Sequence, residues 1–211
     1  MRHIEKKESP KAFEDWKKWF RFKNGRKANY DDLDRDGELK SAIKDELISE
    51  QFGLCCYCCK EIQHDKSHIE HFRPQVSFSE KTVDYENIHA SCNGSKGQNN
   101  HCGHKKGQWF DELLTVSPLE QDCESLFEYN INGDIIPTNE NERAKKTINK
   151  LGLNVYALQT ARAAAIKATG ISSSNFDEET RAFWINYFKK IENGKLKAFN
   201  NSVLYCLNNY I

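Results

Sequence analysis

The chain has 211 residues, which is long enough to bury a hydrophobic core without external cross-links. Lysine plus arginine and aspartate plus glutamate number 31 each, so a globally basic nucleic-acid-binding protein is excluded, and any such binding needs a local patch. The sequence has no run of about 18 apolar residues, and its charged start lacks the apolar segment of a secretory signal. A cytoplasmic protein is therefore expected.

Residues 1–52 are expected to form an N-terminal helical region. Phe13, Trp16 and Phe20 recur at helical spacing, which predicts a packing helix. A second helix is expected from about Glu38 to Phe52, where apolar residues recur every three or four positions.

The loop between these two helices is acidic. Asp32, Asp34, Asp36 and Gly37 imitate the first half of an EF-hand calcium loop, whose twelfth position must be a glutamate. That position is Ile43 in this chain. The sequence therefore favours a loop that caps the following helix.

Eight cysteines point to a metal site, because thiols stay reduced in the cytoplasm and a disulfide framework is not expected there. Cys55 and Cys58 form a CxxC pair, a tight turn that brings two thiolates to one metal ion. Cys56 and Cys59 have the same spacing, and the first register is preferred because it leaves Tyr57 inside the turn.

Cys92 and Cys102 are expected to complete the tetrahedral zinc site across the loop NGSKGQNNH. Residues 55–112 contain few long apolar runs, so a metal ion would supply the stability that this segment lacks. The alternative interpretation is four buried cysteines without a metal.

The segment SHIEHFRP, residues 67–74, lies between the two halves of the cysteine set. Glu70 directly precedes His71, and neighbouring side chains on a strand point to opposite faces. Glu70 can then bind a cation while His71 faces a water molecule beside it. His68 shares the face of Glu70 and is considered as a further metal or phosphate ligand, with a surface histidine as the simpler interpretation. Arg73 is a candidate phosphate contact.

Two regions follow the cysteine segment. Residues 113–140 are expected to form a loop and a β-hairpin, in which Asn132-Gly133 predicts a type I′ turn. Residues 141–211 are expected to form a C-terminal helical region, in which Gly152 ends one helix and Asn154 caps the next. The tail SVLYCLNNYI is apolar enough to dock on this protein or on a partner.

The order CxxC, EH, N, C, C, H, KG resembles the HNH endonucleases that carry a zinc-stapled ββα-metal motif. The resemblance implies an α+β fold, with this motif over residues 53–112 as the core of a mainly helical chain. It also implies four roles: His71 is the general base, Glu70 a metal ligand, Asn87 the asparagine that fixes the loop, and His104 the last metal ligand.

The end of the motif departs from the family pattern. The family usually has CxxC followed at once by His or Asn and then a lysine, whereas nine residues separate Cys92 from Cys102. A second register therefore stays open, with Asn93 as the last metal ligand and His89 as a zinc ligand. His104 is preferred, because Cys102 has no role in the second register.

A wider stretch, roughly residues 50–165, resembles PtuB, the HNH subunit of Septu-type anti-phage systems that also occurs beside some retrons. The resembling segments are SHIEHFRP, YENIHASCNG, HCGHKKG, WFDELLTVSPLEQDCESLFEYNINGDI and RAKKTINKLGLN. The resemblance implies a defence effector that acts with PtuA, an ABC-type ATPase, in some cases within a retron complex. No membrane partner is expected.

As a nuclease, the chain would hydrolyse phosphodiester bonds of DNA or of an RNA such as tRNA. Glu70 and His104 would hold Mg²⁺ or Mn²⁺, His71 would deprotonate the attacking water, and Zn²⁺ would be structural. The expected nucleic-acid contacts are Arg73, Lys96, Lys105, Lys106 and His68.

Two rival functions fit parts of the same sequence. A non-catalytic, zinc-ribbon-like module that binds nucleic acid or protein explains the cysteines but leaves the EH pair unexplained. A scaffold for the ATPase would dock through the aromatic C-terminal helices, and it is compatible with nuclease activity.

Overall fold

The computed structural model describes residues 1–94 and 97–210. Its α-helices are α1 (Lys11–Asn24), α2 (Tyr30–Asp34), α3 (Gly37–Glu50), α4 (Cys102–Lys106), α5 (Glu142–Leu151), α6 (Tyr156–Lys167), α7 (Glu178–Lys189) and α8 (Asn200–Asn209). Its strands are β1 (Ser67–His71), β2 (Ile88–Cys92), β3 (Phe127–Tyr129) and β4 (Ile135–Pro137). Short 3₁₀ helices are η1 (His64–Lys66), η2 (Ser79–Lys81), η3 (Tyr85–Asn87), η4 (Gly97–Asn99), η5 (Cys123–Leu126) and η6 (Thr138–Glu140). The expected α+β class, helices with two small sheets, is confirmed.

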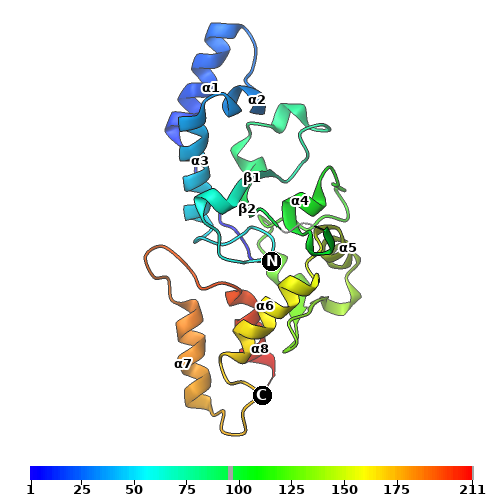
Figure 1. Cartoon of the computed structure of the whole chain (residues 1–211). Coiled ribbons are helices and arrows are strands. Elements are labelled where there is room, and N and C mark those ends of the chain that lie inside the picture. The colour runs from blue at the N-terminus through cyan, green and yellow to red at the C-terminus, as the bar shows by residue number, and fades with distance from the viewer. Residues whose placement is uncertain (95–96, 211) are drawn as a thin grey trace.

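The helices α1, α2 and α3 lie at one end of the molecule and α6, α7 and α8 at the other, with β1, β2 and α4 between them (Figure 1). One cluster of buried apolar side chains runs from Met1 to Leu207, so these parts share a core. In the described part of the chain, no helix combines the length and the apolar character needed to cross a bilayer.

The strands β1 and β2 pair in antiparallel register, with Glu70 opposite His89 and His71 opposite Ile88. A long loop, residues 72–87, joins them, and α4 follows β2 along the chain. The order strand, loop, strand, helix therefore occurs in the segment where the ββα motif is expected.

The acidic segment before α3 caps that helix, as the sequence favoured, but its residues Tyr30–Asp34 form the short helix α2 and not a loop. Asp36 is the N-cap of α3, and its carboxylate accepts a hydrogen bond from the Leu39 amide at 3.1 Å. Asp32 is buried and accepts two hydrogen bonds from the Arg26 guanidinium, at 2.7 and 2.8 Å. A cap and an ion pair account for both carboxylates.

The β3–β4 hairpin is confirmed, but the predicted type I′ turn is wrong. The strands are joined by the five residues 130–134, and Gly133 has a positive φ of 85° whereas Asn132 does not. The side chain of Asn130 accepts a hydrogen bond from the Asn132 amide at 3.0 Å. Arg162 on α6 donates to the Gly133 carbonyl at 2.7 Å, so tertiary contacts select a wider loop than the dipeptide favours.

The C-terminal helices differ from the prediction at one cap. Gly152 ends α5 in the left-handed conformation, as predicted. Asn154 does not cap α6; its amide group instead pairs with the backbone N–H and C=O of Ile135 at 2.9 and 2.8 Å. Residues 202–209 of the apolar tail lie in α8, which packs on α6, α7 and β3, so this part of the tail docks on the chain itself.

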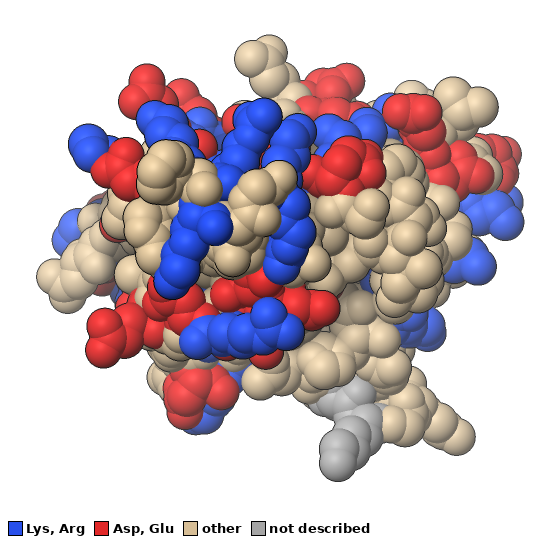
Figure 2. Space-filling model, turned by 90° about the horizontal axis from the view of Figure 1, so that it is seen from above, with Lys and Arg blue, Asp and Glu red and all other residues tan. Residues whose placement is uncertain are grey.

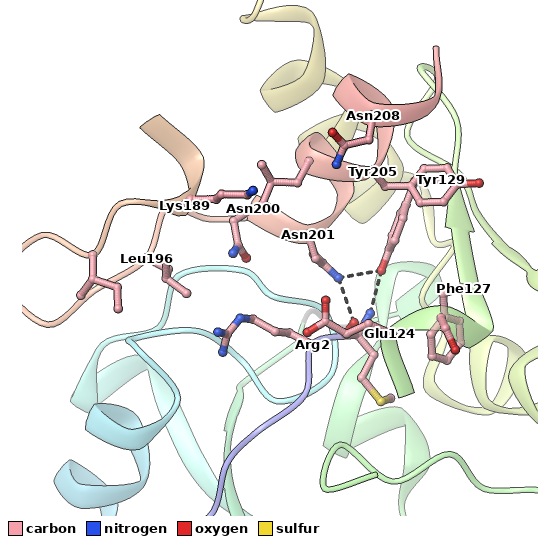
Figure 3. A pocket seen from close by; sticks show the side chains of 14 residues that line it. Arg2, Glu124, Phe127, Tyr129, Lys189, Leu196, Asn200, Asn201, Tyr205 and Asn208 are labelled. Atoms are coloured by element: carbon pink, nitrogen blue, oxygen red, sulfur yellow. Dashed lines mark hydrogen bonds between the residues drawn. The ribbon is translucent and has the colours of Figure 1, made fainter. Parts of the chain in front are cut away.

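The first residues of the chain pack against β3 and α8 (Figure 3). The Met1 amine donates to the Tyr129 hydroxyl at 2.7 Å, and the Asn201 amide donates to the Met1 carbonyl at 2.9 Å. Beside these bonds, Arg2, Glu124 and other residues line a pocket of about 480 Å³. None of the predicted site residues in the described part of the chain lines it.

Candidate functional site

Four buried cysteines from three segments converge on one point. Cys55 and Cys58 lie in the turn after α3, Cys92 ends β2, and Cys102 begins α4. Their sulfur atoms all lie within 4.8 Å of one another, and two of the separations, Cys55–Cys102 and Cys58–Cys92, are 3.8 Å. A tetrahedron with Zn–S bonds of about 2.3 Å has edges of about 3.8 Å. The cluster therefore fits a metal such as zinc.

The preferred CxxC register is the one that brings these sulfurs together. Cys56 and Cys59 are buried outside the cluster, where the Cys59 carbonyl accepts a hydrogen bond from the Phe199 amide at 2.8 Å. His89, the zinc ligand of the second register, does not belong to the cluster either.

The environment of Cys92 favours the form that binds metal. Its contacts with Cys102 and Cys58 outweigh the opposing effects of Cys55 and of burial, and lower the pKa of Cys92 to about 6. The thiolate is thus populated at neutral pH, and the thiolate is the zinc-binding form.

The Glu70 carboxylate on β1 has three polar neighbours, which come from three different segments of the chain. His68 Nε2 lies 3.4 Å from Glu70 Oε2, the Tyr57 hydroxyl donates to Oε1 at 3.2 Å, and Lys106 Nζ lies 2.9 Å from Oε1. Burial on its own would raise the pKa of Glu70, but His68 and Lys106 outweigh it and lower the pKa. Glu70 is therefore a carboxylate at neutral pH, inside the protein.

A glycine in the first turn of α4 makes room for this face. A Cβ atom on Gly103 would lie within 3.0 Å of both Glu70 Oε2 and His68 Nε2, closer than real Cβ contacts come. The α4 backbone can pass over the two side chains only because residue 103 has none.

His68 and Glu70 fit a divalent cation held between them. In an octahedral site, two adjacent ligand atoms that each lie about 2.1 Å from the ion are about 3 Å apart. His68 Nε2 and Glu70 Oε2 are 3.4 Å apart. The oxygen and imidazole donors suit Mn²⁺ and other divalent ions. Lys106 competes for the same carboxylate through its other oxygen.

His71 turns to different partners from those of Glu70. Its Nε2 lies 2.9 Å from the Thr82 carbonyl and its Nδ1 lies 3.2 Å from the Gln75 amide nitrogen. A carbonyl accepts and an amide N–H donates, so these partners place the proton on Nε2 and the lone pair on Nδ1. Burial lowers the pKa of His71, which favours the neutral ring. The Tyr30 ring packs on it in a T-shaped arrangement, with 4.6 Å between the ring centroids.

Asn87 holds the two ends of the loop together. Its carbonyl oxygen accepts from the Arg73 amide at 2.7 Å, and its NH₂ group donates to the Arg73 and Lys81 carbonyls at 3.0 Å. The loop so fixed carries Thr82, the partner of His71.

The two candidates for the last metal ligand, His104 and Asn93, both adjoin His68. The exposed ring of His104 meets the His68 ring edge-on at 4.7 Å between centroids, and Asn93 Oδ1 lies 3.2 Å from His68 Nδ1. Over residues 1–94 and 97–210, no group of three or more donors besides the cysteines is as tightly gathered. His68, considered only as a further ligand, is thus nearer to Glu70 than either candidate.

The predicted nucleic-acid contacts differ in whether their side chains are accessible to a ligand. Lys105 is exposed. The Arg73 guanidinium lies 5.5 Å from the centroids of the Phe78 and Phe110 rings and 3.4 Å from the Glu112 carboxylate. The prediction for Lys106 needs correction, because its side chain is 2% exposed and its Nζ binds Glu70 and the His71 carbonyl. Lys106 is four residues after the buried Cys102, and residues four apart lie on the same face of a helix, so this spacing predicts the inward orientation. Lys96 lies outside the described residues.

Comparison with known proteins gives a partial likeness. The chain is 31% identical over 137 residues to the retron Vc95 putative HNH endonuclease of Vibrio cholerae serotype O1 biovar El Tor. The alignment covers 61% of this chain and 65% of that protein, slightly less than two thirds of its length. No family model matches the chain.

Proposed function

We propose that this chain is a metal-dependent endonuclease of the HNH type that hydrolyses phosphodiester bonds in nucleic acid. The observation that carries the proposal is the adjacent pair Glu70–His71 on β1, next to a cluster of four cysteines that fits zinc. The likeness to the retron HNH protein supports the same reaction.

In this proposal, His71 is the general base. Its Nδ1 takes a proton from the attacking water when the Gln75 amide gives up that position, while Nε2–H keeps its bond to the Thr82 carbonyl. Asn87 keeps that carbonyl in place through the loop. The ring is neutral before the reaction, as a base must be.

Glu70 and His68 would hold Mg²⁺ or Mn²⁺, with His104 or Asn93 close enough to complete or orient the set. Such an ion neutralises charge on the scissile phosphate and on the leaving oxygen. Zn²⁺ at the four cysteines would fix α4 and β2 in position and take no part in the reaction.

We further propose that the chain is the effector subunit of an anti-phage defence system and acts with a PtuA-like ABC-type ATPase. The resemblance to PtuB supports this partnership, and the Vibrio cholerae relative is itself named as a retron protein. DNA or an RNA such as tRNA would be the substrate.

One observation favours a non-catalytic rival. Glu70 is already matched by the buried ammonium of Lys106, so this face of β1 can serve as a structural ion pair in a zinc-stapled binding module. Cleavage assays distinguish the two functions.

The deciding experiment offers plasmid DNA and total tRNA to the protein in Mg²⁺ or Mn²⁺, with and without the ATPase. His71→Ala is compared with His64→Ala, which removes a surface histidine beside Ser41. Ion-dependent cleavage that survives His64→Ala but not a folded, zinc-loaded His71→Ala supports the nuclease. Equal cleavage by both variants, or none under any condition, supports the binding module.

A further inference from the structure

Positive charge is concentrated in one short segment of an otherwise neutral chain. Residues 11–27, which comprise α1 and the turn after it, contain seven lysines and arginines and two carboxylates, a net charge of +5. The remaining residues must therefore carry the opposite net charge, because the whole chain is neutral. A local basic patch of this kind is what a neutral nucleic-acid-binding protein needs.

Part of this charge is already used within the protein. Arg26 binds Asp32, Lys11 pairs with Asp15, and Lys17 pairs with Glu14. The other four cations are exposed and form no ion pair within residues 1–94 and 97–210: Lys18, Arg21, Lys23 and Lys27. Figure 2, which looks down on this end of the molecule, shows Lys and Arg side chains gathered in one area with acidic side chains around it.

Two large aromatic side chains stand among these cations. Phe22 is 91% exposed and Trp19 is 52% exposed, whereas Phe13 on the inner side of α1 is fully buried. Lys23 Nζ lies over the Trp19 ring at 4.8 Å. Exposed aromatic rings interleaved with cations are the arrangement by which proteins stack unpaired bases while binding phosphates.

The position of α1 connects this face to the candidate site. Lys17 Nζ donates to the Val83 carbonyl at 3.3 Å, in the loop that also holds His71 through Thr82. Tyr30, in the helix that follows α1, packs on the His71 ring. A strand lying on α1 would therefore run beside the loop that carries the His71 contacts.

The charges that line the groove between α1 and that loop exclude the groove floor as the place where the strand lies. It has a volume of about 350 Å³, with Lys18, Arg21 and Lys27 on the α1 side. Glu80 and Asp84 line the loop side. Phosphates would be repelled by the loop side and drawn to α1, so the outward face of α1, not the groove floor, is the binding surface.

We propose that α1 is a nucleic-acid-binding arm whose outward face binds a single-stranded stretch, with Trp19 and Phe22 stacked on bases and the four unpaired cations on phosphates. That the bound strand is then cleaved rests on the proposed nuclease function. Binding itself is measured independently of cleavage.

The test is fluorescence anisotropy with labelled 20-nucleotide oligo(dT) and oligo(U), using the full chain with His71→Ala so that bound strands stay intact. Phe22→Ala is expected to weaken binding about fivefold or more without changing the salt dependence, because it removes one stacking contact. Lys18→Ala with Lys23→Ala is expected to reduce the slope of log affinity against log salt by about 1.4, the loss of two phosphate contacts. A duplex should lose less on Phe22→Ala, because its bases are already stacked.

Matched controls come from other exposed surfaces. Phe183→Ala removes a 60% exposed ring on α7, and Lys146→Ala with Lys167→Ala removes two exposed lysines on α5 and α6. Circular dichroism and zinc content establish that each variant is folded. The α1 proposal is overturned if the α1 variants match their controls, or if the parent binds no oligonucleotide. If binding depends on α1 but the chain with His71 intact cleaves nothing, the arm stands and the nuclease proposal fails.

Discussion

The ammonium group of Lys106 on α4 lies 2.9 Å from Oε1 of Glu70 on β1, and the two side chains are only 2% and 8% exposed. The same ammonium donates to the His71 carbonyl at 2.8 Å. One buried cation thus ties the helix to the backbone and side chain of the proposed catalytic strand.

Replacing this cation should cost stability. Lys106→Met leaves the Glu70 carboxylate buried without its partner, and we expect the free energy of unfolding to fall by about 3–5 kcal/mol. Urea denaturation at pH 7 measures the change. Lys105→Met, an exposed neighbour, is the control and should change stability by no more than about 0.5 kcal/mol. Equal midpoints for the two variants would show that the ion pair adds nothing.

Binding of Mn²⁺ should depend on His68 more than on His104. His68 Nε2 is 3.4 Å from the Glu70 carboxylate, whereas His104 packs its ring on that of His68. We expect His68→Ala to weaken Mn²⁺ binding at least tenfold, as measured by electron paramagnetic resonance of free Mn²⁺. Asn93→Ala should have a smaller effect, because Asn93 acts through His68. A larger loss with His104→Ala would restore His104 as the principal ligand.

Gly103→Ala should impair the reaction and leave the zinc in place. The added methyl group would collide with Glu70 and His68 and push them from their positions, which we expect to reduce cleavage about 100-fold. Gly37→Ala is the matched control, since a Cβ there meets nothing within 4 Å. Zinc content by mass spectrometry separates a displaced site from a lost fold. Full activity of Gly103→Ala would mean that the two side chains need not occupy this position.

Removing one cysteine of the cluster should abolish zinc binding. Cys102→Ser deletes a sulfur that lies 3.8 Å from Cys55, and we expect the zinc content to fall from about one ion per chain towards zero, with loss of cooperative unfolding. Cys123→Ser removes another buried cysteine outside the cluster and should keep its zinc. A Cys102→Ser protein with full zinc content would contradict the four-sulfur site.

His89 should make the fold sensitive to acid. It is fully buried, neither ring nitrogen has a hydrogen-bond partner in the described part of the chain, and burial lowers its pKa well below the ordinary value. Below about pH 6.5 the unfolded chain gains a proton that the folded chain does not, so stability falls as pH falls, by up to about 1.4 kcal/mol per unit. His89→Leu should reduce the slope of stability against pH between pH 7 and 5 in urea denaturation, while the buried His71 keeps part of it. His64→Leu should leave the slope unchanged. An unchanged slope in His89→Leu would assign the acid sensitivity to other groups.

Local signals in the sequence predicted the helices α1, α3 and α5 and the cysteine set. The spacing of apolar residues predicted α1 and α3. Asp36 marks the start of α3, and Gly152 marks the end of α5. The CxxC pair and two later cysteines sufficed to select the four sulfurs that converge. These features depend on near neighbours or on donor chemistry, so they can be predicted without knowing the fold.

Contacts between distant segments determined the hairpin turn, the cap of α6 and the side-chain positions around Glu70. The Asn132-Gly133 turn was widened by Arg162, and Asn154 was drawn from its helix cap to Ile135. Lys106 was turned inward because burying Glu70 requires a compensating cation, and His68 came to lie beside Glu70 where α4 passes over both. Only the tertiary structure fixes such pairings, because their stability comes from burial and charge compensation between residues far apart in the chain.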